Sequence, residues 1–332
     1  MGRHAASEPA DRIEAFAAGR ILVVALGGWN DAGEAATAAV EELRRVVGAT
    51  RMIDVVDDED FFDYSIQRPR IGRDEHGVRR FEWPSTVLFG AEAGARERVN
   101  LAEDAALRVS GGGGDLLVLT GPEPTLRWRS YADRIMELCV REGVTRLVLL
   151  GALLADAPHS RPIQVHASSE DPSVQTEFGV ERSEYSGPTG VLSVLGAAGE
   201  RLGMRVLSLW ASVPHYAHHA PSPKAVLALV DRLEEVVDVP IPRQHLVEAA
   251  REWVDEVDGA VAEDGEIGEY VRFLERAYDT VEAPEASGEA IAKEFERFLQ
   301  RDAGPGKPGG PGWAGTAEDG EEPDGPQPPQ AD

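Results

Sequence analysis

Between residues 20 and 212, short apolar and β-branched runs alternate with amphipathic stretches. Several of the runs, such as RLVLLGALL at 146–154, are apolar throughout, which is typical of strands buried on both faces of a parallel sheet. Strands that alternate with helices form β-α-β units, which pack as a sheet between two helical layers. The sequence therefore predicts a three-layer α/β/α sandwich with a mostly parallel sheet. The expected strands cover residues 20–26, 51–56, 86–92, 115–121, 146–154, 163–169 and 205–212. The expected helices cover residues 32–47, 95–110, 129–143, 188–203, 222–238, 243–264, 266–281 and 287–301.

After Ala220 the strand pattern stops, and four stretches carry the 3.6-residue period of amphipathic helices. They predict a helical subdomain over residues 221–301, following an α/β/α core over 19–220 and an N-terminal extension over 1–18. Residues 302–332 are rich in Gly, Pro and acidic residues and have almost no aliphatic side chains. Such a composition cannot bury enough apolar surface to fold, so we expect a disordered acidic tail.

The loop after the first strand reads GGWNDAG, at the place where many α/β proteins bind a phosphate. It has neither the glycine spacing of a dinucleotide fingerprint nor the Lys and Ser/Thr of a P-loop. Asn30 or Asp31 is placed to cap the following helix, so a side-chain oxygen would take the free amides and Asp31 would repel a phosphate. One interpretation is a tight capped turn that uses Gly27, Gly28 and Gly33, with Trp29 folded over it. The other is a ligand site, because open α/β sheets bind ligands at this edge.

Other charged and aromatic residues follow the strands that end near Gly121 and Leu154. The carboxyl ends of parallel strands share one edge of a sheet, so these loops are expected to form a common strand-end rim. The rim is predicted to be a pocket, an interface or a stabilising ion-pair network. Its candidate residues are Gly28, Trp29, Asn30, Asp31, Gly33, Glu123, Arg127, Trp128, Asp156, His159, Arg161, His215 and Tyr216.

Two further clusters could suggest a metal, but we predict no metal site and no cofactor. The run DVVDDEDFFDY at 54–64 is acidic enough to attract a hard cation, although a solvated loop is the simpler interpretation. His215, His218 and His219 have a spacing that would bring imidazoles together on a helix, but the prolines around them argue against a helix. The stretch 68–84 resembles an inserted loop or hairpin with its turn near Gly77.

The chain carries a formal net charge of −26 and a sequence pI near 4.7. Such a charge repels nucleic acids and anionic lipid, which leaves small molecules or other proteins as partners. The one cysteine, Cys139, excludes an internal disulfide and fits a reducing cytoplasm. The N-terminal residues lack the apolar stretch of a signal peptide, and no later stretch is long and apolar enough to span a membrane.

Familiar catalytic motifs are missing from the sequence. It contains no G-x-S-x-G nucleophile elbow, no H-E-x-x-H zinc motif and no C-x-x-C pair. The common hydrolytic and redox chemistries therefore lack their minimal parts, and we favour a protein that is not an enzyme.

Six short motifs occur together in an order that resembles the PAC2 family, named after proteasome assembly chaperone 2, and in particular its actinobacterial members. Each motif is weak alone, but the ordered set is specific and extends from about residue 20 to 300. The motifs are GWNDAG (28–33), TGPEPTLRW (120–128), GALLADAPHSRP (151–162), YSGPTGVLSVL (185–195), LWASVPHY (209–216) and EFERFLQ (294–300).

The resemblance implies a fold similar to the nucleoside phosphorylase and hydrolase-like sandwiches, with a helical subdomain. It also implies a non-enzymatic protein that associates with itself and with proteasome subunits. Several relatives dock through a C-terminal hydrophobic-Tyr-X tail, whereas this chain ends Gln-Ala-Asp. The alternative is a small-molecule binder or an enzyme that uses the strand-end rim, either phosphorylase or hydrolase-like or an ATP-dependent ligase.

Overall fold

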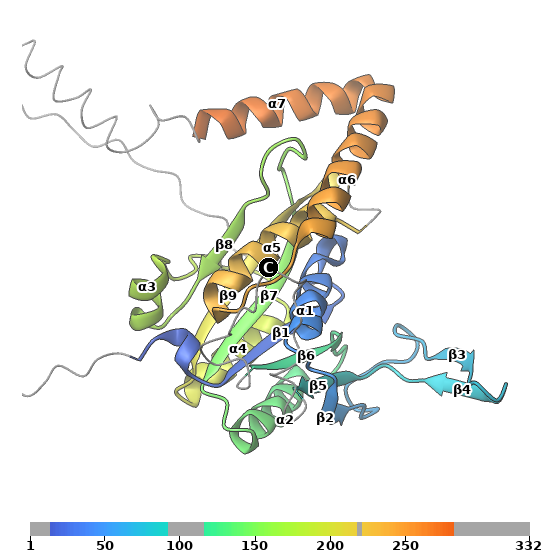
Figure 1. The fold of residues 1–332 in the computed structure, drawn as a ribbon, viewed down its shortest axis with the longest axis vertical. Coiled ribbons are helices and arrows are strands. Elements are labelled where there is room, and N and C mark those ends of the chain that lie inside the picture. The colour runs from blue at the N-terminus through green and yellow to red at the C-terminus, as the bar shows by residue number, and fades with distance from the viewer. Residues whose placement is uncertain (1–13, 92–115, 218–220, 282–332) are drawn as a thin grey trace, which may run out of the picture. The chain divides into compact units, whose positions relative to one another are not determined.

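The structure is a computed structural model that describes residues 14–91, 116–217 and 221–281 (Figure 1). The chain divides into two compact units, Met1–Asp279 and Thr280–Asp332, and the described elements lie in the first unit apart from the end of the last helix. Three features expected from the sequence lie outside the described residues: the tail and the helical patterns at 95–110 and 287–301. Most of the N-terminal extension and the histidines at 218 and 219 also lie outside them.

The described residues contain a seven-stranded sheet in the order β2-β5-β6-β1-β7-β9-β8. The four central strands β6, β1, β7 and β9 run parallel, and the remaining strands pair antiparallel. No helix connects β2 to β5, and β5 returns antiparallel to β2. All seven expected strands are present. They are β1 (Ile21–Gly27), β2 (Arg51–Val56), β5 (Thr86–Gly90), β6 (Leu116–Pro122), β7 (Arg146–Ala155), β8 (Val165–Ser168) and β9 (Arg205–Pro214).

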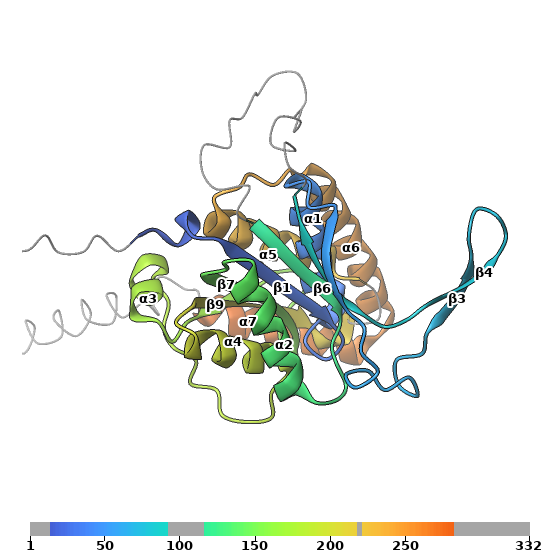
Figure 2. The ribbon, with the colours of Figure 1, turned by 90° about the horizontal axis from the view of Figure 1, so that it is seen from below.

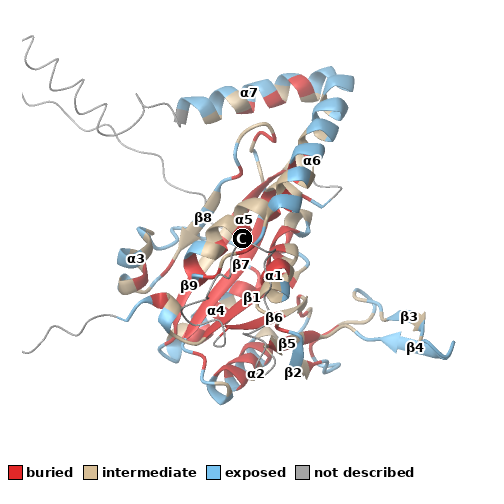
Figure 3. Ribbon diagram, in the orientation of Figure 1, coloured by how far each residue is buried: buried red, intermediate tan, exposed pale blue. Residues whose placement is uncertain are grey.

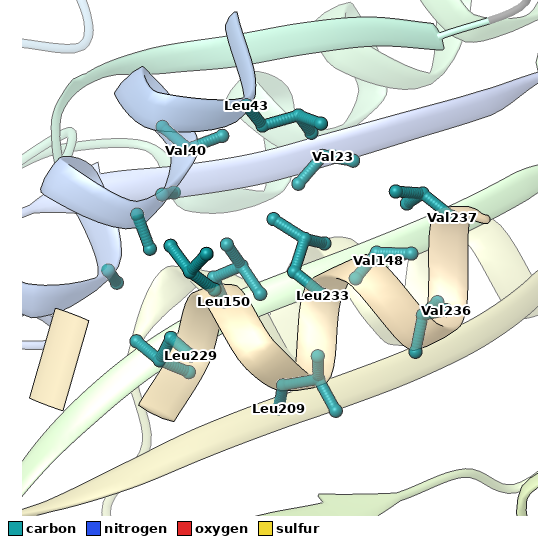
Figure 4. Packing of buried hydrophobic residues seen from close by; sticks show 14 of the residues in the cluster. Val23, Val40, Leu43, Val148, Leu150, Leu209, Leu229, Leu233, Val236 and Val237 are labelled. Atoms are coloured by element: carbon teal, nitrogen blue, oxygen red, sulfur yellow. The ribbon is translucent and has the colours of Figure 1, made fainter. Parts of the chain in front are cut away.

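Helices cover both faces of the sheet, which confirms the three-layer α/β/α sandwich (Figure 2). Successive side chains of a strand point to opposite faces, so Val23 packs under α1 and α5, whereas Val24 packs under α2 and α4. In Figure 4, Leu229 of α5 lies near Leu150 of β7, and Leu233 lies near Val148. The helices are α1 (Ala35–Val46), α2 (Trp128–Arg141), α3 (Pro172–Phe178), α4 (Val191–Arg201), α5 (Pro223–Val237), α6 (Gln244–Glu263) and α7 (Gly265–Val281).

The helix α3 has no counterpart among the helices expected from the sequence. It has seven residues, too few to show an amphipathic period. The local sequence feature that marks the start of α3 is an N-cap residue. Asp171 Oδ1 accepts hydrogen bonds from the amides of Ser173 at 2.7 Å and Val174 at 3.4 Å.

The sequence assigns α5 to the helical subdomain, and the structure places it against the sheet. Its buried residues Leu229 and Leu233 belong to the same hydrophobic cluster as Val23 of β1 (Figure 4). The next helix, α6, buries only Leu246, Ala250 and Trp253, and its remaining residues are all at least partly exposed (Figure 3). Within the described ranges, no helix is both long and apolar enough to span a lipid bilayer.

A separate two-stranded hairpin stands between β2 and β5 in the chain, so of the two forms expected for the insertion at 68–84 the structure has the hairpin. It consists of β3 (Arg70–Arg73) and β4 (Arg79–Glu82), and its turn contains Gly77 with a φ of 75°. Its strands pair only with each other, away from the main sheet (Figures 1 and 2). Nearly every residue in the two strands is exposed (Figure 3).

Candidate functional site

The turn after β1 satisfies the amides of the following helix with a side chain, as the sequence predicts. Asp31 Oδ1 accepts hydrogen bonds from the amides of Ala36 at 2.7 Å and Thr37 at 3.2 Å. Its other oxygen accepts one from the Thr37 hydroxyl at 2.5 Å. These amides open α1 and are the groups that a phosphate would otherwise bind. Burial is the main cause of the raised pKa of Asp31, and hydrogen bonds from Thr37 and Ala36 oppose it.

Asn30 and Glu123 form a buried polar pair between the loops after β1 and β6. Asn30 Nδ2 donates to Glu123 Oε1 at 2.6 Å, and that oxygen also accepts from the amide of Val191 at 2.9 Å. The backbone joins the same loops, since the Glu123 amide donates to Gly27 O at 2.7 Å. Asn30 and Glu123 are only 1% and 8% exposed, so the pair lies beneath the surface of the strand-end rim.

Two glycines of the opening loop allow close packing at this edge. Gly28, with a φ of 133°, lies beside the side chain of Glu123. Gly33, with a φ of 61°, accepts a hydrogen bond from the amide of Ser222 at 2.8 Å. Trp29 does not fold over the loop, because 68% of its surface is exposed. The loop is therefore a tight capped turn that presents an indole to solvent.

Arg127 and Trp128, at the start of α2, do not join the polar pair. Arg127 has a φ of 51° and forms an exposed ion pair with Asp60 at 3.1 Å. The Trp128 indole donates to Pro124 O at 2.6 Å and packs against the core on the α2 side of the sheet. Both residues occupy the predicted edge but serve the local geometry of the β6–α2 loop.

His159 lies at the centre of a second buried cluster, in the loop after β7. Its amide and its Nδ1 both lie 2.8 Å from the hydroxyl of Tyr216, and its Nε2 lies 3.0 Å from Asp258 Oδ1 on α6. Lys224 Nζ donates to the His159 carbonyl at 2.5 Å, and the Trp253 ring packs edge-on against the imidazole. These contacts are satisfied together if Tyr216 donates to Nδ1 and Nε2 carries the proton.

Two of these groups have altered acidity. Burial raises the pKa of Tyr216 to about 12. Burial, with a smaller contribution from the charge of Arg161, lowers the pKa of Lys224. The shifts follow from desolvation of the charged forms. The phenol of Tyr216 therefore stays protonated at neutral pH and can act as a hydrogen-bond donor.

The remaining rim residues contact α7. Asp156 accepts a hydrogen bond from the Tyr270 hydroxyl at 2.9 Å, and His215 Nδ1 lies 3.3 Å from the same carboxylate oxygen. Arg161 forms a two-point contact with Asp279, at 2.7 and 2.8 Å. This geometry is the strong form of an arginine–carboxylate pair.

The predicted rim is therefore two clusters at one sheet edge. The first contains Asn30, Asp31 and Glu123, and the second is built around His159. They are connected through the β1 loop, because Ala152 of β7 donates its amide to Asn30 O at 2.8 Å. Across the described ranges, no group of three or more His, Cys, Asp or Glu side chains is arranged to hold a metal ion.

Several residues of these clusters were not identified from the sequence. Thr37 and Val191 complete the first cluster, and Lys224, Trp253 and Asp258 complete the second. Gly190 also belongs to the first cluster, because a side chain there would overlap the Asn30 amide. The Pro at 188 and the Gly at 190, before α4, are a local signal of a tight helix start. No local signal marks Asp258 on the exposed, charged pattern of α6.

The fold and the site place the protein in a structural class. It is an α/β/α sandwich in which the loops after the parallel strands are joined by hydrogen bonds between buried side chains. The chain belongs to the PAC2 family, whose model matches residues 25–261. No curated protein matches the chain.

Solved structures agree with this assignment. The chain is 38% identical to a PAC2 family protein from Streptomyces avermitilis, with 76% of this chain and 99% of that chain covered and a TM-score of 0.65. It is 36% identical to a Mycobacterium tuberculosis proteasome-assembly chaperone homologue, with the same coverage and a TM-score of 0.63. Pyrococcus furiosus PbaB, an archaeal proteasome activator, shares the fold at 16% identity, with 77% and 96% covered and a TM-score of 0.55.

Proposed function

We propose that this chain is a non-enzymatic interaction protein of the cytoplasm that associates with itself and takes part in proteasome assembly. The observation that carries the proposal is the 36% identity to the mycobacterial proteasome-assembly chaperone homologue, over 99% of that chain. The more distant archaeal proteasome activator supports it only through the fold.

The chemistry of the strand-end rim supports a binding role over a catalytic one. Asp31 and Glu123 are the two buried carboxylates of the rim, and both are engaged by neighbouring donors of the protein. The third rim carboxylate, Asp156, accepts a hydrogen bond from Tyr270. The backbone at Gly190 packs directly on Asn30 and covers its pair with Glu123. A general acid or base must reach the atom that it protonates or deprotonates, and the two buried carboxylates are covered.

Apolar side chains surround the covered polar pair and are exposed. Trp29 lies in the β1 loop, Leu126 in the β6 loop, and Leu153 and Leu154 at the end of β7, with exposures of 68%, 43%, 41% and 48%. Aromatic and aliphatic side chains of this kind form the anchors of protein interfaces. The proposed partner surface is this carboxyl-terminal edge of the sheet.

Co-purification tests the proposal. The tagged full-length chain is expressed in a cell that contains a 20S proteasome, and the recovered α and β subunits are quantified. We expect these subunits to be recovered with the wild type, and their recovery to fall at least fivefold with Trp29→Ser.

The matched control is Leu202→Ser, at the end of α4, where the side chain is 54% exposed. This variant should recover the proteasome subunits like the wild type. Absence of proteasome subunits from the wild-type preparation, with normal proteasome assembly in a deletion strain, would refute the proposal.

A further inference from the structure

The β3–β4 hairpin concentrates positive charge in a chain of net charge −26. Arg73 and Arg79 are directly opposite each other in the strand register, an arrangement that destabilises a hairpin when nothing neutralises it. The segment from 68 to 82 carries three acidic residues and five arginines: Arg68, Arg70, Arg73, Arg79 and Arg80.

Only part of this charge is neutralised within the chain. Arg80 pairs with Asp74 at 3.0 Å, and Arg73 donates to the carbonyl of Gly77 at 2.7 Å. Across the residues that the structure describes, the other three arginines form no ion pair and no side-chain hydrogen bond: Arg68, Arg70 and Arg79. Arg70 lies directly opposite Glu82 in the strand register, whereas Arg68 and Arg79 have no such acidic neighbour within the described residues. The hairpin therefore exposes more positive charge than its own acidic residues neutralise.

The same hairpin exposes an apolar stripe. Ile71 and Phe81 are opposite each other in the register and are 57% and 56% exposed. The Phe81 ring lies 6.3 Å from the ring of Trp83, which is 50% exposed. An isolated two-stranded hairpin is marginally stable in water, so a hairpin that exposes an apolar side favours a covering surface.

Unpaired acidic residues lie beside the base of the hairpin. The Trp83 ring packs on Tyr64 at 4.9 Å, and burial together with the charges of Glu59 and Asp57 raises the pKa of Tyr64. Asp57, Asp58 and Glu59 are exposed, and within the described ranges none of them forms an ion pair. The acidic residues 57–59 therefore lie close to Tyr64, which contacts Trp83 at the base of the hairpin that carries the arginines.

We propose that the hairpin and residues 57–59 form a twofold contact between two copies of the chain, with the arginines of each hairpin facing residues 57–59 of the other copy. A twofold contact requires one patch to complement itself, and a patch with acids on one side and arginines on the other does so. Ile71, Phe81 and Trp83 form its apolar centre. Nucleic acid is a poor occupant because the acidic segment and the net charge would repel it.

This inference rests on the self-association in the proposed function, and it names the surface that produces it. Sedimentation of the purified full-length chain measures it without any proteasome. A dimer that persists in the surface variants would reject this surface alone, whereas loss of proteasome co-purification with an intact dimer would reject only the proteasome role. We expect a wild-type dimer, with Arg79→Glu or Asp58→Arg each raising the dimer dissociation constant about tenfold or more. Phe81→Ser should have a similar effect, because it removes the centre of the contact.

Mixing the two charge-reversed variants gives the sharpest result. In a twofold contact, a chain with Arg79→Glu and a chain with Asp58→Arg place opposite charges together at both contacts. The equimolar mixture should therefore form a heterodimer that neither variant forms alone. Arg182→Glu, at an exposed arginine outside the hairpin, is the matched control and should sediment like the wild type.

Unchanged thermal unfolding verifies that each variant is folded. A wild type that stays monomeric at about 100 μM, a dissociation constant far weaker than specific homodimers show, overturns the proposal. So does a dimer that persists in Arg79→Glu and Phe81→Ser, or a mixture of the two charge variants that stays monomeric.

Discussion

The side-chain amide of Asn30 donates a 2.6 Å hydrogen bond to Glu123, which follows it by 93 residues in the chain. The same carboxylate oxygen accepts the amide of Val191, so one buried oxygen joins the loops after β1 and β6 to the start of α4. That oxygen connects the three chain segments of the first rim cluster, the one that contains Asn30, Asp31 and Glu123.

Removing this oxygen should destabilise the fold. Glu123→Ala leaves two buried donors without an acceptor, which should lower the free energy of unfolding by about 2 to 4 kcal/mol. Glu123→Gln keeps an oxygen at the same position and should change it by less than about 1 kcal/mol. Urea unfolding of both variants measures the difference, and equal losses would contradict the structural role assigned to the oxygen.

The raised pKa of Asp31 predicts a pH dependence of stability. Because the folded state binds the proton more tightly than the unfolded state, the stabilisation from this group is present below its ordinary pKa of 3.8 and is lost as pH rises through the folded pKa. Asp31→Asn cannot titrate. The unfolding free energy of the wild type minus that of Asp31→Asn should therefore decrease from acidic to neutral pH, measured by urea unfolding along a pH series. A flat difference would show that burial does not shift the pKa of this carboxyl.

The contact of Arg161 with Asp279 is expected to slow the local opening of α7. Arg161→Met removes both hydrogen bonds to the helix, and hydrogen exchange should become faster in α7 while the central strands keep their rates. Arg161→Lys should restore only part of the protection, since an ammonium group cannot make the two-point contact. The control is Arg272→Met on the exposed side of α7. Unchanged exchange in Arg161→Met would mean that other contacts hold the helix.

Position 121 in β6 is expected to accept only glycine. It has a φ of 149°, and a side chain there would overlap the backbone of Ser85. Gly121→Ala should lower the unfolding free energy by about 3 kcal/mol or more, because strain and overlap add. Gly77→Ala, at a φ of 75° in open space, should lower it by only about 1 to 2 kcal/mol. Thermal or urea unfolding gives both values, and similar losses would refute the role of the Ser85 contact.

The sequence predicts at which edge of the sheet most residues of the candidate site lie. It does not predict which of them form hydrogen bonds with each other. The strand pattern puts Asn30, Glu123 and His159 in loops at one edge, and the structure places them there. The capping role of Asp31 was also predictable, since the amides that it binds are five and six residues away. The partner of His159 on α6 lies 99 residues later, and nothing local to Asp258 marks it.

The sequence by itself determined the seven strands, those periodic helices that lie in the described ranges, an insertion at 68–84 and a side-chain cap at Asn30 or Asp31. Each depends on the spacing of apolar residues or on side chains a few positions from the backbone they bind, so the information is local. Only the tertiary structure decided that α5 lies on the sheet, that Asn30 pairs with Glu123, and that Trp29 faces solvent. Those outcomes depend on which distant surfaces meet, and the free energy of each contact exists only once the layers have packed.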